Sequence, residues 1–341
     1  MQRGRHYDPS MGDARLAALA RFNELGGKLR VALTERCNLD CFFCHNEGMP
    51  NPRRGAALDA GRLSDEQLVA IMNAWTALGG AQLNLTGGEP LLHPRLWTIL
   101  EAIERRKTRV ILNSNGLLAH RLLDRSTLAP LDALFVSLHT VDESLWKRHL
   151  VHGSAASVLE AIARLRQRGY RVQLNFSLGD YNLRGFDEVL RFALDQGIDL
   201  KIIALIRAGT DRDFYGGAFA DPLAVEDRLA AHGAARLGER RGLGGFVTRF
   251  SLAGSTIEVK NVARGRLRTS FCEGCPVEQQ CGEGMYALRV GVDGWWKPCL
   301  LRRERFTRVD ESSSLREQLL DRIATMIGAP ESARFADGPP L

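Results

Sequence analysis

Three cysteines stand close together in the first part of the chain, at Cys37, Cys41 and Cys44. This spacing puts three thiolates on one short loop, where they can hold three irons of a [4Fe-4S] cube and leave the fourth iron open for chemistry. Structural zinc prefers four ligands in pairs, and the nearest fourth candidate, His45, is awkwardly placed for a tetrahedron. Three buried core thiols would have no reason to adopt this spacing. The motif therefore favours an iron–sulfur cluster with an open iron over zinc or core packing.

A glycine-rich motif, Thr86-Gly87-Gly88-Glu89-Pro90, follows the second strand that the sequence predicts. Two glycines let the backbone approach a ligand closely, and the carboxylate of Glu89 can accept hydrogen bonds from an ammonium group. Taken alone, the motif favours an ordinary turn between a strand and a helix.

Four further cysteines form a second group near the carboxyl end of the chain. Cys272, Cys275 and Cys281 are spaced C-x2-C-x5-C, and Cys299 follows after seventeen intervening residues. Two pairs of thiolates make a sound tetrahedral zinc site, so zinc competes with an iron–sulfur cluster here. Seven cysteines in groups of three and four indicate metal ligation in a reducing compartment and not a disulfide framework.

The first two motifs together resemble the signature of radical S-adenosylmethionine (SAM) enzymes, including the aromatic Phe43 just before the last cysteine. The resemblance implies that the open iron chelates SAM, that Gly87, Gly88 and Glu89 hold its methionine amine, and that Phe43 lies against the cofactor. One-electron reduction would then yield a 5'-deoxyadenosyl radical, which removes hydrogen from a substrate. A one-electron donor such as a flavodoxin or ferredoxin is the expected partner.

Polar residues also follow the later strands, and any of them can be a simple turn or cap residue. The family resemblance places Ser114, Ser137 and Asn175 near the carboxylate or ribose of SAM. His139 is a possible substrate contact, and a hydrogen-bonded structural histidine is at least as compatible with the sequence.

The second cysteine group resembles the auxiliary-cluster region of the molybdenum-cofactor GTP 3',8-cyclase family, which implies a second [4Fe-4S] cluster. The chain departs from that family's pattern in several places. Cys281 adds a fourth thiol that would close the cluster, Leu92-His93 replaces an arginine after the glycine motif, and a terminal Gly-Gly is missing. The segment Pro276-Val277-Glu278-Gln279-Gln280 stands where that family has nucleotide-binding arginines. These departures argue against GTP cyclisation as the leading function.

We therefore expect a radical SAM enzyme of specialised metabolism that acts on a nucleoside, nucleotide or sugar, by decarboxylation, epimerisation, cyclisation or carbon–carbon coupling. The alternatives are a peptide-modifying maturase and GTP 3',8-cyclisation. Arg264, Arg266 and Arg268 alternate along one predicted strand and so face one side. They form either a solvated face or a wall for an anionic substrate.

The elements that must position these motifs alternate between strand and helix, which predicts parallel strands with right-handed crossovers. Six such steps end near residue 206, so we expect a partial (β/α)6 barrel of TIM type, with reactive groups at the carboxyl ends of its strands. The expected units are a lead-in (1–28), the barrel (29–206), an auxiliary-cluster domain (207–311), and a helix with tail (312–341). The expected strands are 29–34, 81–86, 109–113, 133–138, 172–177 and 200–206, the expected helices are 14–25, 65–78, 94–105, 118–128, 154–169, 185–196 and 315–327, and a hairpin is expected from 255–261 and 264–269.

The composition is that of an ordinary globular protein. The chain has 341 residues, 45% of them apolar and 25% charged, with a net charge of +6. This modest excess suits an anionic small molecule and does not by itself imply nucleic acid. No apolar stretch is long enough to cross a membrane, and the first residues lack the apolar core of a secretory signal, so we expect a cytoplasmic protein.

Overall fold

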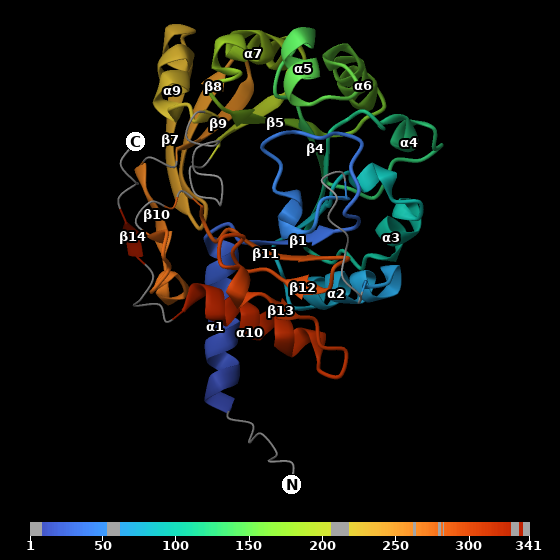
Figure 1. The fold of residues 1–341 in the computed structure, drawn as a ribbon, viewed down its shortest axis with the longest axis vertical. Coiled ribbons are helices and arrows are strands. Elements are labelled where there is room, and N and C mark those ends of the chain that lie inside the picture. Colours follow the sequence, from blue (N-terminus) through green and yellow to red (C-terminus); the bar gives the residue numbers. More distant parts are fainter. Residues whose placement is uncertain are drawn as a thin grey trace.

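A curved, mostly parallel sheet forms the centre of the fold, with helices around its outer side (Figure 1). The computed structural model describes residues 9–52, 62–205, 218–261, 264–278, 281, 283–328 and 334–336. In these ranges the strands are β1 (Lys28–Ala32), β2 (Gln82–Thr86), β3 (Arg109–Ser114), β4 (Ala133–Ser137), β5 (Val172–Leu178), β6 (Asp199–Ala204), β7 (Ala235–Gly242), β8 (Gly245–Leu252), β9 (Ser255–Asn261), β10 (Arg266–Arg268), β11 (Ala287–Gly291), β12 (Trp295–Trp296), β13 (Thr307–Arg308) and β14 (Arg334–Ala336). The helices are α1 (Pro9–Glu24), α2 (Asp65–Ala77), α3 (Leu96–Ala102), α4 (His120–Leu123), α5 (Glu143–His149), α6 (Ala155–Gln167), α7 (Phe186–Asp195), α9 (Pro222–Ala231) and α10 (Leu315–Ile327).

The order of strands in the large sheet is β11-β1-β2-β3-β4-β5-β6-β9-β8-β7. All neighbours from β11 to β9 pair in parallel, so the six predicted barrel strands are confirmed as consecutive neighbours. Four strands from beyond residue 206 extend this sheet: β11 lies next to β1, β9 lies next to β6, and β8 and β7 follow β9 at the edge. The barrel boundary expected at residue 206 therefore falls within one continuous sheet.

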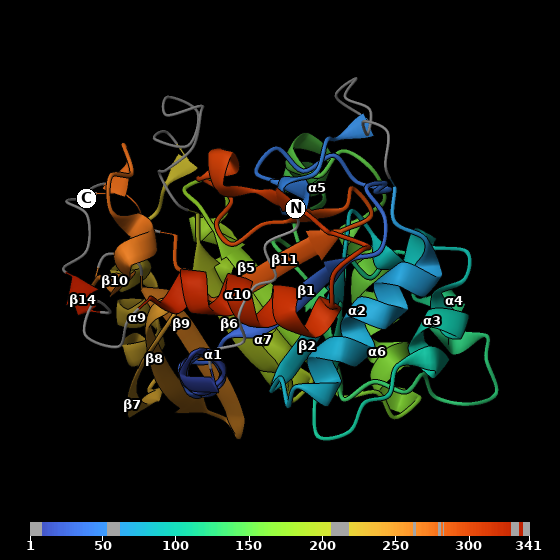
Figure 2. The ribbon, with the colours of Figure 1, turned by 90° about the horizontal axis from the view of Figure 1, so that it is seen from below.

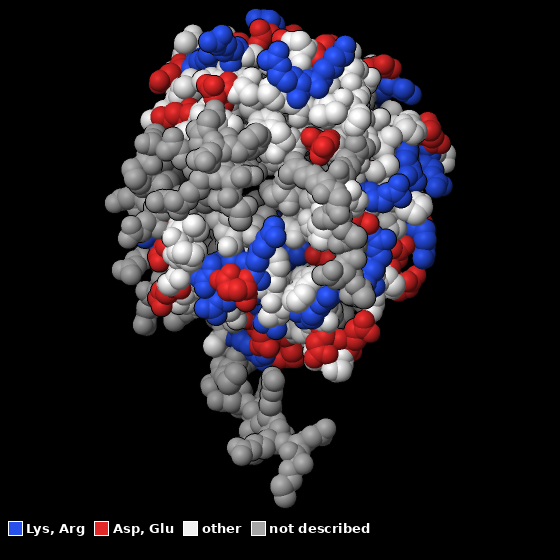
Figure 3. Space-filling view, viewed as in Figure 1, with Lys and Arg blue, Asp and Glu red and all other residues white. Residues whose placement is uncertain are grey.

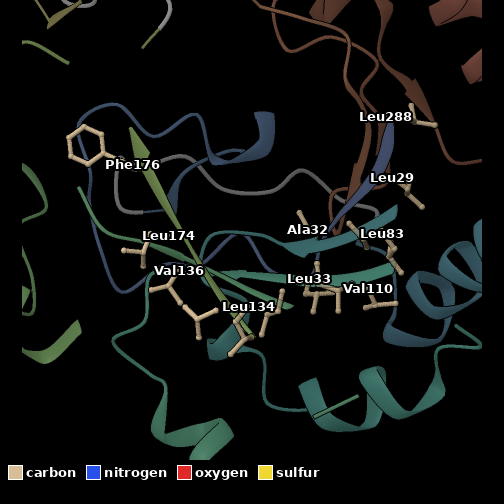
Figure 4. Packing of buried hydrophobic residues seen from close by; sticks show 14 of the residues in the cluster. Leu29, Ala32, Leu33, Leu83, Val110, Leu134, Val136, Leu174, Phe176 and Leu288 are labelled. Atoms are coloured by element: carbon tan, nitrogen blue, oxygen red, sulfur yellow. The ribbon is translucent and has the colours of Figure 1, made fainter. Parts of the chain in front are cut away.

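Alternate residues of the strands point to opposite sides, as strand geometry requires. One set is apolar and packs against the helices; Figure 4 shows members of this buried core, including Leu29, Leu83, Val110, Leu134 and Leu174. The other set faces the hollow side of the curved sheet, which we call the lumen. Many lumen residues are polar or charged, whereas a barrel interior that served only for packing would be apolar.

The helices follow local sequence signals where these are strong. Helix α2 begins with a capping box in which Ser64 and Gln67 satisfy each other's backbone amides, and α10 has the predicted bounds Leu315–Ile327. The helix predicted over 118–128 is reduced to the four residues of α4. Helices α5 and α9 and the hairpin of β7 and β8 were not predicted.

The predicted hairpin of 255–261 with 264–269 is wrong. Strand β9 pairs with β8 on one side and β6 on the other, whereas β10 pairs with β14. Alternating apolar residues mark a strand, but the choice of its partner depends on contacts distant in sequence.

Helices α1 and α10 pack together on the outer side of the sheet near β11 and β1; they lie below the sheet in Figure 1 and in front of it in Figure 2. On the face shown in Figure 3, basic and acidic side chains are interspersed around the rim, as expected for a solvated surface. None of the described helices has the length and apolarity that a bilayer crossing requires.

Candidate active site

The first cysteine group lies on the loop that leaves the carboxyl end of β1. Backbone bonds from Asp40 to Leu150 and from Phe42 to His149 tie this loop to the end of α5, so it crosses one mouth of the lumen. Burial and the neighbouring thiols of Cys44 and Cys37 raise the pKa of Cys41. The three sulfurs are thus close enough to influence one another, as ligands of a common group must be.

In the part of the chain that the structure describes, no three Cys, His, Asp or Glu side chains already stand at metal-binding separations. A cluster bound by Cys37, Cys41 and Cys44 would therefore draw the three thiolates closer on their loop. The donor set itself fits an iron–sulfur cluster with one open iron.

The two glycines of the second motif pack against the backbone that leads into the cysteine loop. Gly88 donates its N–H to Thr34 O at 2.7 Å, and Glu89 donates to Arg36 O at 2.8 Å. A Cβ on Gly88 would lie 2.1 Å from Arg36 O, and Gly87 has a φ of +150°, which favours glycine. These glycines therefore fix the position of the cysteine loop.

Glu89 is buried at the end of β2 and accepts three hydrogen bonds. The donors are the Leu91 N–H at 3.0 Å, the Ser114 hydroxyl at 2.9 Å and the Asn115 N–H at 2.7 Å. Burial raises the pKa of its carboxyl to about 7, against the lowering effect of these donors. Removal of a carboxylate from water is costly unless a cation compensates it, so this site suits an ammonium group. Ser114 thus supports Glu89.

Asn115 connects Glu89 to the cysteine loop, although the sequence analysis did not single it out. Its Nδ2 lies 3.8 Å from the sulfur of Cys37 and donates to Asn38 Oδ1 at 2.7 Å. Its position directly after Ser114 on the strand end could have indicated this role.

Phe43 belongs to a cluster of aromatic rings beside the cysteine loop. It stacks on Tyr181 with ring centroids 5.9 Å apart and meets His139 edge-on at 5.1 Å. His139 accepts a hydrogen bond from Ser177 N at 3.0 Å, and burial lowers its pKa to about 4. His139 is therefore a neutral, hydrogen-bonded histidine that packs against the loop.

Ser137 and Asn175 are partners in the register of β4 and β5. Asn175 lines an open cavity in the lumen, with about 700 Å³ of empty space that is partly continuous with solvent. Among the described residues, its buried Oδ1 has no hydrogen-bond partner. Its amide therefore faces the lumen cavity, with an acceptor available to a ligand.

Five basic side chains line the lumen cavity: Lys28, Arg30, Lys201, Arg240 and Lys260. Burial lowers the pKa of Lys28, and so do the nearby charges of Lys201 and Arg30. Lys201 lies 3.9 Å from Glu258, whereas the ammonium groups of Lys28 and Lys260 lie 5.7 and 4.9 Å from the ring centre of Tyr286. The cavity is thus a concentration of positive charge, which favours an anionic ligand.

The lumen cations were missed at the sequence level, although a signal was present. Arg30, Lys201 and the neighbouring Asn84 and Asn113 interrupt strands that should be apolar throughout if both faces of the sheet were simply packed. Polar residues at alternate positions of parallel strands indicate a ligand-lined interior.

The second cysteine group surrounds a smaller cavity, with about 320 Å³ of empty space that is partly continuous with solvent. All four thiols line it, Cys281 included. Burial raises the pKa of Cys281 to about 11 and that of Cys299 to about 12, so the thiolate forms need positive charge or a metal ion nearby. Four converging thiols fit either a closed [4Fe-4S] cluster or zinc.

The predicted arginine wall is already engaged with partners. Arg264 pairs with Glu226 and Glu239, and Arg268 lies 3.7 Å from Glu278. Arg266 lines the second cysteine cavity, with Nη1 3.7 Å from the sulfur of Cys272. The cationic surface suited to a substrate is therefore the lumen and not this strand.

Comparison with known proteins gives a consistent picture. A protein-family model described as the radical SAM superfamily matches residues 31–193. Curated proteins named probable GTP 3',8-cyclase are similar along most of the chain. That of Pyrococcus horikoshii is 30% identical over 83% of this chain and 86% of its own length. That of Aeropyrum pernix is 31% identical over 83% of this chain and 76% of its own length.

Two solved structures share the fold at low sequence identity. SuiB of Streptococcus suis, bound to its precursor peptide SuiA, has a TM-score of 0.60 at 14% identity. The match covers 94% of this chain and 72% of the SuiB chain. The structure of anSMEcpe with bound AdoMet and Kp18Cys peptide has a TM-score of 0.52 at 13% identity, with 87% and 80% covered. These likenesses support the predicted barrel of the radical SAM type.

Proposed function

The chain belongs to the radical SAM superfamily and is an enzyme of that class, and we propose that its substrate is an anionic nucleotide, nucleoside or sugar bound in the lumen. Membership implies a [4Fe-4S] cluster and SAM. We assign the cluster to Cys37, Cys41 and Cys44, and the methionine amine of SAM to Glu89.

When bound, the cluster and SAM supply one-electron chemistry that ends in hydrogen abstraction from the substrate. The contribution of the chain is positional. Glu89 presents a desolvated carboxylate to an ammonium group, and Asn115 holds the Cys37 end of the loop against it. Phe43 and Tyr181 pack beside the loop and keep water from that side.

The observation that carries the substrate class is the link between the lumen cations and the cysteine loop. Arg30, in the wall of the cavity, forms an ion pair with Glu47, which lies only three residues beyond Cys44. An anion held by Lys28, Lys201 or Lys260 would lie in the same cavity as Arg30, whose partner Glu47 follows the cysteine loop. This geometry supports a phosphorylated or carboxylated substrate.

GTP is the first substrate to test. Cys281, Leu92-His93 and the segment 276–280 make GTP cyclisation an alternative, and not the leading expectation, at the level of sequence. The curated relatives favour that alternative over a general nucleoside or sugar reaction. The peptides bound to SuiB and anSMEcpe belong to those proteins, and a peptide substrate is a second outcome that the same assay can detect.

We also propose that the second cysteine group holds an auxiliary [4Fe-4S] cluster with four protein ligands, with zinc as the competing occupant. A cluster closed by Cys281 suits electron transfer or structural support better than direct binding of substrate. A flavodoxin or ferredoxin would supply the electron for the first cluster.

The test is substrate-dependent formation of 5'-deoxyadenosine by the anaerobically reconstituted enzyme. GTP, other nucleotides, sugar phosphates and a peptide set would be compared with a low-potential reductant. Lys201→Met should raise the KM for the anionic substrate about tenfold, a change of about 1.4 kcal/mol, and leave SAM cleavage without substrate unchanged. Lys107→Met, on the exposed surface, is the matched control. Equal KM values in both variants would exclude the lumen as the anion site.

A further inference from the structure

One buried arginine contacts the segments that carry both cysteine groups. Arg289 lies on β11, directly opposite Arg30 in the pairing of β11 with β1, and its side chain is 1% exposed. Its Nε is 3.3 Å from Glu47 Oε2, and its Nη2 is 3.3 Å from Glu283 Oε1. Glu47 follows the first cysteine group by three residues, and Glu283 follows Cys281 by two.

These four side chains form an alternating, charge-balanced network: Arg30, Glu47, Arg289 and Glu283. Arg30 also binds Glu47, so loss of Arg289 leaves the carboxylate near the first cysteine loop with one guanidinium partner. Among the described residues, Arg289 is the cation that pairs with Glu283. The two ends of the network therefore depend on Arg289 to different degrees.

The end at Glu283 reaches the second cysteine cavity. Glu283 lines that cavity together with the four thiols. Arg289 Nη2 lies 3.3 Å from this carboxylate, so a carboxylate and its guanidinium partner stand together at the wall of the thiol cavity. Charge near an iron–sulfur cluster shifts its reduction potential.

We propose that Arg289 is a positioning residue that sets the reduction potential of the second cysteine site by neutralising Glu283, and that its ion pair with Glu47 ties this site to the loop of the first. The inference rests on the proposed auxiliary cluster. It assigns to the network a role that neither cysteine group has by itself: electrostatic coupling of the two sites.

The test is a redox titration of the reconstituted protein, with each cluster followed by its electron paramagnetic resonance signal. Arg289→Gln should shift the second-site potential to more negative values, because an uncompensated carboxylate disfavours the added electron. Glu283→Gln should shift it to more positive values, and the double variant should lie between the two. Arg289→Lys keeps the positive charge and should restore most of the original potential.

Arg303→Gln is the control, because Arg303 is close to Cys299 in sequence but exposed. Metal analysis comes first: zinc at the second site would overturn both the cluster assignment and this inference. Iron at that site with a potential that Glu283→Gln leaves unmoved, or that both single variants shift in the same direction, would overturn this inference alone. Glu283→Gln keeps the test decisive if Arg289→Gln does not fold.

Discussion

The two cysteine groups are built in opposite ways. Cys37, Cys41 and Cys44 lie within eight consecutive residues on a loop at the mouth of the lumen, and Cys44 is exposed. In the second group, Cys299 joins Cys272, Cys275 and Cys281 from a separate segment, and three of these four are buried around a cavity. A single loop can supply three ligands and leave an iron accessible, whereas four thiols from two segments enclose their occupant.

In the proposed function, the first group starts the reaction and the second group supports it. The first group adjoins Glu89, which is buried with its hydrogen-bond donors and suits an incoming cation. The second group adjoins Arg266, Arg302 and Glu283, whose charges act on the thiols themselves. The predictions below test whether the two sites are separable.

The largest effect is expected from replacement of Cys37, Cys41 and Cys44 together by alanine. Formation of 5'-deoxyadenosine should cease, and iron should fall by about four from a total of about seven to eight per chain. Iron analysis and chromatography of the products measure this. Residual SAM cleavage would mean that the second group can start the reaction, which would remove the contrast between the sites.

Cys281→Ser should weaken the second site and spare the first. Loss of one of four ligands opens that site, so its iron should decrease while SAM cleavage in the absence of substrate stays within a few fold of the parent. The measurement is iron content alongside 5'-deoxyadenosine formed without substrate. Full retention of iron would show that Cys281 is not a ligand.

Glu89→Gln should change the pH dependence of stability in the protein without SAM. The pKa of Glu89 is about 7 in the folded protein and 4.5 ordinarily, so its favourable contribution is complete below pH 4.5 and is lost as the pH rises through 7. The free energy of unfolding should therefore fall by about 3 kcal/mol over this range in the parent, relative to the variant. Denaturant unfolding at pH 5 and pH 8 measures the difference. Parallel curves for the two proteins would contradict it.

Asn115→Ala should have the smallest effect. It tests whether a change beside the first cysteine group leaves the second group unaffected. Loss of the amide near the Cys37 sulfur should lower the potential of the first cluster by about tens of millivolts, since hydrogen bonds to cluster sulfurs raise it. The bond from the Asn115 backbone to Glu89 remains. The second-site potential is an internal control, and an equal shift at both sites would point to a general structural change.

The sequence by itself determined the features that depend on neighbours along the chain. The spacing of the first three cysteines, the glycines before Glu89 and the alternation of strands and helices are local, so they indicated the first site and six barrel strands directly. Family membership then confirmed the radical SAM class. Prediction was weakest where partners are distant, as in the pairing of β9 with β6 and β8.

Only the tertiary structure decided what lies between the two cysteine groups. Lys28, Lys201 and Lys260 come from strands far apart in sequence and converge because alternate residues of a curved parallel sheet face one lumen. In the same way, β11 returns beside β1 and brings Arg289 to Glu47. Local pattern fixes which residues can face the lumen, but only the closing of the sheet brings their charges together, because Coulomb interactions depend on distance in space.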